Sequence, residues 1–180
     1  MRTSFKIHAG LQFALSLTGL LAGTLATVPH RPPFTDEWVA LGIGIALLVP
    51  LHLLTIVRSC AIALRTDGQT TKAHQWQAFR ALPLPARLLL VGAGLAGVAL
   101  FAGTGKAPSH LVNPGSADGR YFAVDTADPR RQRTEIPRST YEALRKDEQT
   151  SLFAGYALLA AGGGGMTLVF AKLDSWAGAR

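Results

Sequence analysis

The chain has 180 residues and a net charge of +7, yet only 16% of its residues are Asp, Glu, Lys or Arg, against roughly 25% in a typical soluble domain. A single cysteine, Cys60, excludes an internal disulfide and any oxidoreductase that passes electrons between two thiols. The composition therefore argues against a water-soluble globule, a secreted disulfide scaffold and a disordered chain.

Four stretches without a charged residue cover nearly half of the sequence, at residues 7–28, 38–57, 88–105 and 151–171. A bilayer core about 30 Å thick requires about 20 apolar residues when the segment is helical. The pattern predicts an all-α integral membrane protein, a single membrane domain over residues 1–180, in which these stretches are four transmembrane helices.

The connection between the first two spans is rich in proline at residues 29–33, and proline cannot continue a helix. We expect Thr35 or Asp36 to cap the second span, and Trp38 to place its ring at the membrane interface. A short loop between two antiparallel helices is the consequence.

A polar and basic segment follows the second span, at residues 66–87. Trp76, Phe79 and Arg80 lie at positions i, i+3 and i+4, so a helix here has one face suited to the head groups of a membrane. Pro83 ends the pattern. The alternative use of such a face is a docking site for a soluble partner.

The polar loop at residues 106–150 separates the last two spans. We read residues 113–115, Asn-Pro-Gly, as a turn, residues 120–125 as a short strand and residues 133–136 as its return. A two-stranded hairpin is barely stable alone in water, so it must pack against a helix, the membrane or a partner.

After Pro137, the sequence predicts one long helix from about residue 140 through residue 171, with its first turns outside the bilayer. Ser139 and Glu142 have the spacing of a capping box, in which each side chain accepts from the other residue's backbone amide.

Gly92, Gly94 and Gly97 match the G-x-G-x-x-G pattern of a dinucleotide site, and Asp118 follows at a suitable distance. No second apolar strand ends near that acid, and no further strand–helix units follow. We interpret the segment instead as a membrane helix in which small residues such as Ala93 and Gly97 allow close packing.

Small residues recur in every predicted span, and close backbone approach is what dispersion contacts between helices in lipid require. Four consecutive glycines at residues 162–165 predict a tight crossing or a local kink, with a functional hinge or ligand contact as the alternative. The helix-packing residues expected from these patterns are Gly19, Gly23, Gly92, Gly97, Gly162, Gly163, Gly164 and Gly165.

His8 and His52 lie at similar depth, near one membrane face, if both termini are on the same side. Two imidazoles at one depth are candidate ligands for haem or a metal, although nothing else in the sequence completes a ligand set. Polar side chains within the first span, which we expect to bond across helices or to their own backbone, are Gln12, Ser16 and Thr18.

The basic residues indicate an orientation. The total of Lys and Arg is tied at nine on each side, because eight lie in residues 106–150. Short loops next to the early spans weigh more, and there two precede the first span, one lies in the first loop and five lie between residues 58 and 87. This contrast favours both termini in the cytoplasm and residues 106–150 outside. The 13 Arg against 5 Lys favour a GC-rich bacterial genome, and hence a bacterial plasma membrane.

A resemblance rests on three segments: Tyr-Phe at residues 121–122, IPRSTYEALR at residues 136–145 and SLFAG at residues 151–155. Together they resemble a pattern in uncharacterised small four-helix bacterial membrane proteins. The resemblance implies an extracytoplasmic hairpin and a Tyr-bearing helix before the last span, and it implies no activity.

No span carries a carboxylate, and no nucleophile has an identifiable base and orienting acid. We therefore expect a non-enzymatic accessory or sensing subunit without a cofactor. The alternatives are a small transporter or channel component and a haem- or metal-binding redox subunit. The expected partners are the lipid bilayer and another membrane protein or a second copy, not nucleic acid, since the basic residues flank apolar runs.

Overall fold

The computed structural model describes residues 3–28, 37–65, 71–105 and 107–177 and is mostly helical. Four of the helices are long and apolar enough to cross a membrane: α1 (Thr3–Thr27), α2 (Glu37–Arg65), α4 (Leu84–Ala102) and α5 (Arg138–Ala177). The proline-rich segment, the caps expected at Thr35 or Asp36 and the side chain of Trp38 lie outside the described part of the chain.

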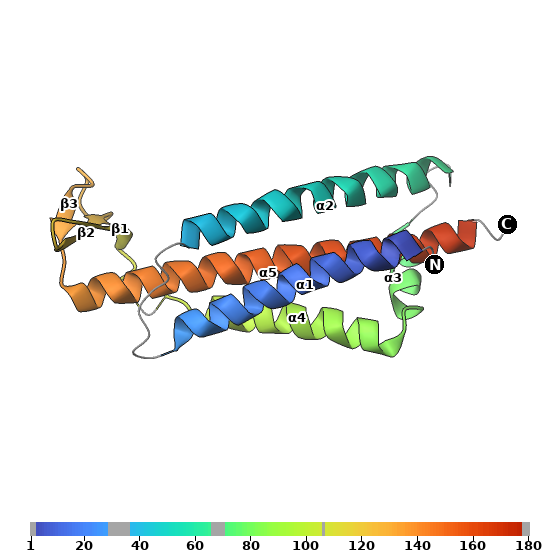
Figure 1. Cartoon of the computed structure of the whole chain (residues 1–180), viewed down its shortest axis with the longest axis horizontal. Helices are drawn as coiled ribbons and strands as arrows, with labels where there is room; N and C mark the ends of the chain where they lie inside the picture. Colours follow the sequence, from blue (N-terminus) through green and yellow to red (C-terminus); the bar gives the residue numbers. More distant parts are fainter. Residues whose placement is uncertain (1–2, 29–36, 66–70, 106, 178–180) are drawn as a thin grey trace.

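The long helices form an antiparallel bundle in which α5 is central (Figure 1). α1 packs along α5, while α2 and α4 contact this pair from opposite sides. The start of α1, the end of α5 and the short helix α3 (Lys72–Arg80) share one end of the bundle, and a small sheet occupies the other.

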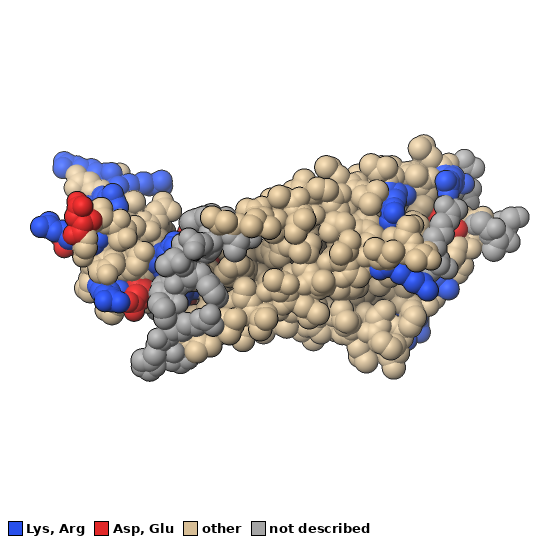
Figure 2. All heavy atoms as spheres, in the orientation of Figure 1, with Lys and Arg blue, Asp and Glu red and all other residues tan. Residues whose placement is uncertain are grey.

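Charged side chains gather at the two ends of the molecule, and the face between them is without visible Lys, Arg, Asp or Glu (Figure 2). This surface is apolar over the bundle: Leu21, Ile43 and Leu95, from three different helices, are each about 60% exposed. An uncharged apolar belt around a bundle is favourable in contact with the hydrocarbon of a membrane and unfavourable in contact with water.

Apart from Phe5, the residues that α1 buries are polar or small rather than large and apolar. Its interior face contains His8, Gln12, Ser16 and Gly19, whereas leucines such as Leu11 point outward. The helix is therefore inverted relative to a helix of a soluble bundle, whose apolar stripe faces the core.

Helix α3 forms as the amphipathic pattern predicts, with Thr71 as its N-cap and a capping box completed by His74. Its Ala78 is fully buried and packs with Phe5 of α1 and Leu173 of α5. Trp76 and Phe79 stack with their ring centroids 5.5 Å apart, and both border the space between α3 and α5.

The polar loop contains a three-stranded antiparallel sheet, not the two-stranded hairpin expected from the sequence. The strands are β1 (Leu111–Ala117), β2 (Arg120–Asp125) and β3 (Arg133–Glu135), in the order β1-β2-β3. The turn expected at residues 113–115 is wrong. Those residues form an irregularity within β1, where Asn113 has φ 52° and the register shifts.

The turn lies at Asp118 and Gly119 instead, with φ values of 52° and 74°. Positive φ at both central residues is the requirement of a two-residue type I′ hairpin, and Asp-Gly is one of its preferred sequences. Asp118, considered above as the acid of a dinucleotide-site pattern, is thus a turn residue.

The sheet packs on the first turns of α5 to form a unit that we call the headpiece, residues 107–150. Its core joins Ala123 and Ile136 to Leu144 of α5, and the rings of Tyr121 and Tyr141 lie 4.7 Å apart. Further anchorage comes from Asp147, whose carboxylate accepts from the backbone amides of Gly105 and Ala107.

α5 begins at Arg138, so Ser139 lies inside the helix, and the capping box expected at Ser139 is wrong. Glu142 accepts a 2.8 Å hydrogen bond from the guanidinium of Arg138. At 40 residues the helix is about 60 Å long, twice the thickness of a bilayer core, which leaves room for both headpiece and span on one continuous element.

Candidate functional site

A polar network joins α1, α2 and α5 inside the bundle, toward the end that carries α3 and the two chain ends. Its members include Gln12, Thr55 and Thr167, all buried. Buried polar groups are costly unless hydrogen-bonded, and an ionisable residue such as His8 within a helix apolar enough to span a membrane is a candidate for function. This network is therefore the candidate site.

His8 anchors one arm of the network. Its Nε2 donates to the carbonyl of Leu51 at 2.9 Å, and its Nδ1 accepts from Nη1 of Arg58 at 3.0 Å. These two partners fix the ring as the neutral tautomer with the proton on Nε2. Arg58 also lies over the ring of Phe5, with Cζ 4.6 Å from the centroid, so α1 and α2 are joined at their shared end.

Two threonines carry the second arm from α2 to α5 and on to α1. The hydroxyls of Thr55 and Thr167 are 3.0 Å apart, and Thr167 donates to Oε1 of Gln12 at 3.0 Å. The other end of that amide is unsatisfied: Nε2 of Gln12 is buried and has no hydrogen-bond partner among the described residues. The network thus ends on an unused donor inside the bundle.

His52 faces the same region from α2. Its Nδ1 lies 3.0 Å from the carbonyl of Leu48 in its own helix, and its Nε2 lies 3.2 Å from the carbonyl of Leu159 on α5. The side chain of His52 thus connects α2 directly to the backbone of α5 at Leu159.

Gly163 is the point where these side chains meet the backbone of α5. A Cβ at this position would lie 2.6 Å from Nε2 of Gln12 and 2.8 Å from Cε1 and Nε2 of His52. Both distances are well inside van der Waals contact. The absence of a side chain at Gly163 is what lets Gln12 and His52 approach α5 from two other helices.

Other glycines among those predicted to pack also allow a close approach between helices, in these cases by apolar side chains. A Cβ at Gly19 would meet Tyr156, one at Gly97 would meet Leu158, and one at Gly165 would meet Leu90, all at 2.7–2.9 Å. Looser contacts, at 3.3 Å, surround Gly23 and Gly164.

Gly92 and Gly162 differ from that group. The structure has no heavy atom of the described residues within 4 Å of a Cβ added at either position, so neither contributes to packing between these helices. α5 also runs as an unbroken α-helix through residues 162–165, so the four glycines do not interrupt it. The glycine run therefore does not form the kind of broken helix that lines transporter sites.

The two histidines are brought into one region but do not converge on a shared point. The Nε2 atoms bond to different carbonyls, of Leu51 and Leu159, and Nδ1 of His8 is occupied by Arg58. Among the described residues, no group of three or more His, Cys, Asp or Glu side chains is placed to hold a metal ion. This donor set does not fit an axial pair for haem.

The G-x-G-x-x-G pattern lies wholly within α4. Ala93 and Gly97 are the buried residues of that helix, as expected for a small-residue packing pair. The strand and turn of a dinucleotide site are not formed.

Sequence reasoning found part of the network. Gln12 and Ser16 bond across helices, the latter to the carbonyl of Ala157 at 2.9 Å, and Thr18 bonds back to its own helix, which confirms the expectation for all three. It missed Thr55, Arg58 and Thr167. A usable signal was present on α2, because His52, Thr55 and Arg58 are spaced three apart and share one helix face.

No known protein family, curated protein or solved structure matches this chain significantly.

Proposed function

We propose that the protein is a four-span protein of a bacterial plasma membrane and acts as a non-enzymatic accessory or sensing subunit. The observation that carries this proposal is the continuity of α5. This single helix contributes to the headpiece core at one end, contacts α1, α2 and α4 along its length, and contacts α3 near its other end.

The distribution of charge supports the orientation. α3 and the segments beside it carry Arg65, Lys72 and Arg80, at the same end of the bundle as both chain ends. An excess of Lys and Arg in a short loop next to the spans marks the cytoplasmic side. In this orientation the headpiece is extracytoplasmic and α3 lies on the cytoplasmic membrane surface.

The polar network supports a sensing role over a purely structural one. Thr167 lies on α5, and its hydroxyl bonds with Thr55 of α2 and Gln12 of α1. A rotation or shift of α5 must therefore break these specific hydrogen bonds, whereas purely apolar contacts between helices would change gradually. An element with discrete arrangements is what couples two distant sites.

The experiment perturbs the headpiece and reads the opposite end. Ile136→Asp places a charge in the headpiece core, where Ile136 is 8% exposed; Gln132→Asp places the same charge on the headpiece surface. The chain is reconstituted in nanodiscs and amide hydrogen exchange is measured. We expect Ile136→Asp to speed exchange in α3 by at least about threefold, a change that hydrogen exchange resolves as local opening, while Gln132→Asp leaves exchange in α3 unchanged.

Two results would contradict the proposal. Faster exchange confined to the headpiece would mean that α5 transmits nothing to α3. Turnover of a substrate by the purified chain alone would remove the non-enzymatic role.

A further inference from the structure

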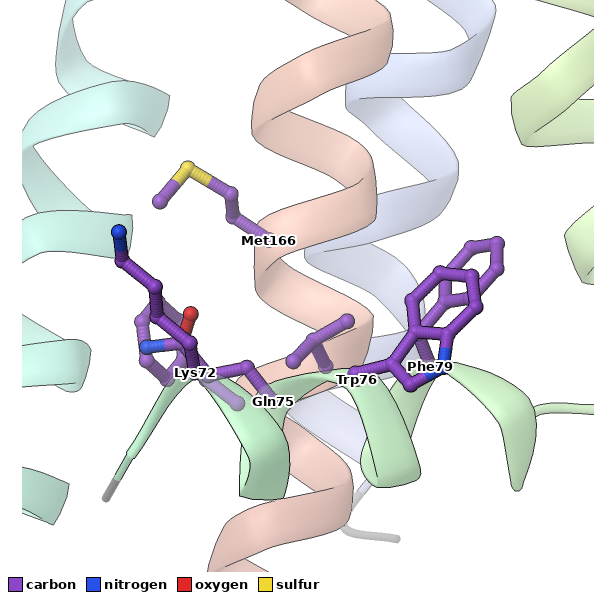
Figure 3. A pocket seen from close by; sticks show the side chains of 7 residues that line it. Lys72, Gln75, Trp76, Phe79 and Met166 are labelled. Carbon is purple, nitrogen blue, oxygen red and sulfur yellow. The ribbon is translucent and has the colours of Figure 1, made fainter.

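A cleft lies in the corner between α3 and α5, at the end of the bundle that bears the chain ends (Figure 3). Its volume is about 380 Å³, in the range that small-molecule sites occupy. Most of its wall is apolar, and the residues that form it include Trp76 and Phe79 of α3 and Met166, Val169 and Phe170 of α5.

One charged side chain borders this apolar space. Lys72 rises from the first turn of α3 alongside α5, so that its ammonium group approaches the side of Met166 (Figure 3). Met166 is 57% exposed and Trp76 is 60% exposed, so the cleft opens outward at the edge of the uncharged belt. An ammonium group at an apolar surface requires an anionic partner or water to remain charged.

We infer that this cleft binds an anionic phospholipid. The acyl chain lies against Met166, Val169 and Phe170, and the phosphate of the head group pairs with Lys72. The inference rests on the membrane placement proposed above, which sets α3 at the head-group level with its aromatic side next to the acyl chains. An indole at that level is the usual interfacial placement of tryptophan.

A lipid fits the cleft better than a helix from another protein. The cleft is an open corner between α3 and α5 with a volume of about 380 Å³, and a helix about 10–12 Å across with its side chains would fill that volume with roughly one turn. An acyl chain is slender enough to enter, and a phosphate is the anion available at this depth in every bilayer leaflet.

Trp76 provides the probe for the test. The chain has three tryptophans, so the substitutions Trp38→Phe and Trp176→Phe leave Trp76 as the single indole. This variant is reconstituted in nanodiscs that contain phosphatidylcholine and phosphatidylglycerol at a ratio of about 4:1, so that about one-fifth of the lipid is anionic. Bromine is carried on the acyl chains of one lipid or the other, and quenching of Trp76 is compared per mole of brominated lipid.

We expect brominated phosphatidylglycerol to quench Trp76 about fivefold more efficiently than brominated phosphatidylcholine, the ratio that one lysine near a membrane surface supports. Lys72→Gln abolishes this preference. The matched control Lys6→Gln removes the same charge from an exposed position on α1 and preserves it. Val169→Trp is designed to fill the cleft with a bulky side chain. This variant also carries Trp76→Phe and therefore lacks the fluorescent probe, so bound phosphatidylglycerol is counted by native mass spectrometry. We expect the amount of bound phosphatidylglycerol to fall.

Equal quenching by the two lipids overturns the inference, as does an equal loss of preference in Lys6→Gln and Lys72→Gln, which indicates only diffuse surface charge. Protection of Trp76 from both lipids also overturns it, because protein then covers the cleft. A chain that fails to enter nanodiscs at all contradicts the proposed function itself, so the two failures are distinguishable.

Discussion

α4 and α5 are both apolar helices rich in glycine, and on each helix the glycines divide between packed and open positions: Gly97 of α4 lies against Leu158, and Gly162 of α5 faces open space. On α5, Gly163 and Gly165 lie against side chains of other helices, whereas on α4, Gly92 and Gly94 have no such neighbour within 4 Å of an added Cβ among the described residues. The difference shows that, in an apolar bundle, a glycine gains value only from the face on which it lies. A G-x-x-x-G spacing by itself does not reveal that face.

The largest effect that distinguishes packed from open glycines is expected within the glycine run of α5. Gly163→Ala adds a Cβ into the space of Gln12 and His52, and overpacking of this kind costs about 1–3 kcal/mol. We expect a loss of about 2 kcal/mol in the free energy of unfolding, measured by reversible SDS titration from mixed micelles.

The matched control is its neighbour, Gly162→Ala, which faces open space. Since alanine has the higher helix propensity, by up to about 1 kcal/mol in water, this variant is expected to be neutral or slightly stabilising. Equal destabilisation by the two substitutions would mean that the packing assigned to Gly163 is wrong.

A smaller effect is expected from the polar network. Thr167→Val keeps the shape of the side chain but removes the hydroxyl that donates to Gln12. Hydrogen bonds between membrane helices average about 0.6 kcal/mol and reach about 1.7 kcal/mol, so we expect a loss of about 1 kcal/mol in the same titration.

Thr18→Val serves as the reference for that change. Within the described part of the chain, the Thr18 hydroxyl bonds to the carbonyl of Ala14 in its own helix, on an exposed face, so its removal should leave stability unchanged. If Thr18→Val costs as much as Thr167→Val, the network adds nothing beyond local helix bonding.

The smallest effect is expected at the edge of the bundle. The Arg65 side chain is 59% exposed and that of Asp174 is 12% exposed, and Nη1 of Arg65 lies 3.2 Å from Oδ1 of Asp174, so water reaches this pair from the Arg65 side. Exposed pairs contribute about 0–1 kcal/mol and are screened by salt. Arg65→Gln should therefore change the unfolding free energy by less than about 0.5 kcal/mol, and 1 M NaCl, with a Debye length of about 3 Å, should erase the difference. A larger, salt-independent loss would point to a structural role for Arg65.

The helices were predictable because their signal is averaged over many residues. Four uncharged runs place four long apolar helices, and the amphipathic spacing of Trp76 and Phe79 places α3. The long helix through residues 140–171 was also found, with its start misplaced by two residues, because the pair Arg138–Glu142 replaced the expected cap.

Long-range features were not predictable in the same way. β1 was missed because Asn113-Pro114-Gly115 has the composition of a turn, although the sheet absorbs it as an irregular register shift and places the turn at Asp118-Gly119. The meeting of Gln12, His52 and Gly163 depends on three helices distant in sequence. Local periodicity gives a helix face, but it does not say which faces meet.

The central claim is that the bundle crosses a bilayer with the headpiece on one side and α3 on the other. Cys60 is the single cysteine, so Cys60→Ser gives a thiol-free background for labelling with a membrane-impermeant maleimide. Three positions are then tested one at a time: Ala127→Cys in the headpiece, Ser175→Cys near the end of α5 and Leu95→Cys on the outer face of α4.

On intact cells the account predicts that only the cysteine at position 127 reacts, that the one at position 175 reacts after the membrane is opened, and that the one at position 95 stays protected in both conditions. Simultaneous labelling at positions 127 and 175 on intact cells, or rapid labelling at position 95, would contradict the account.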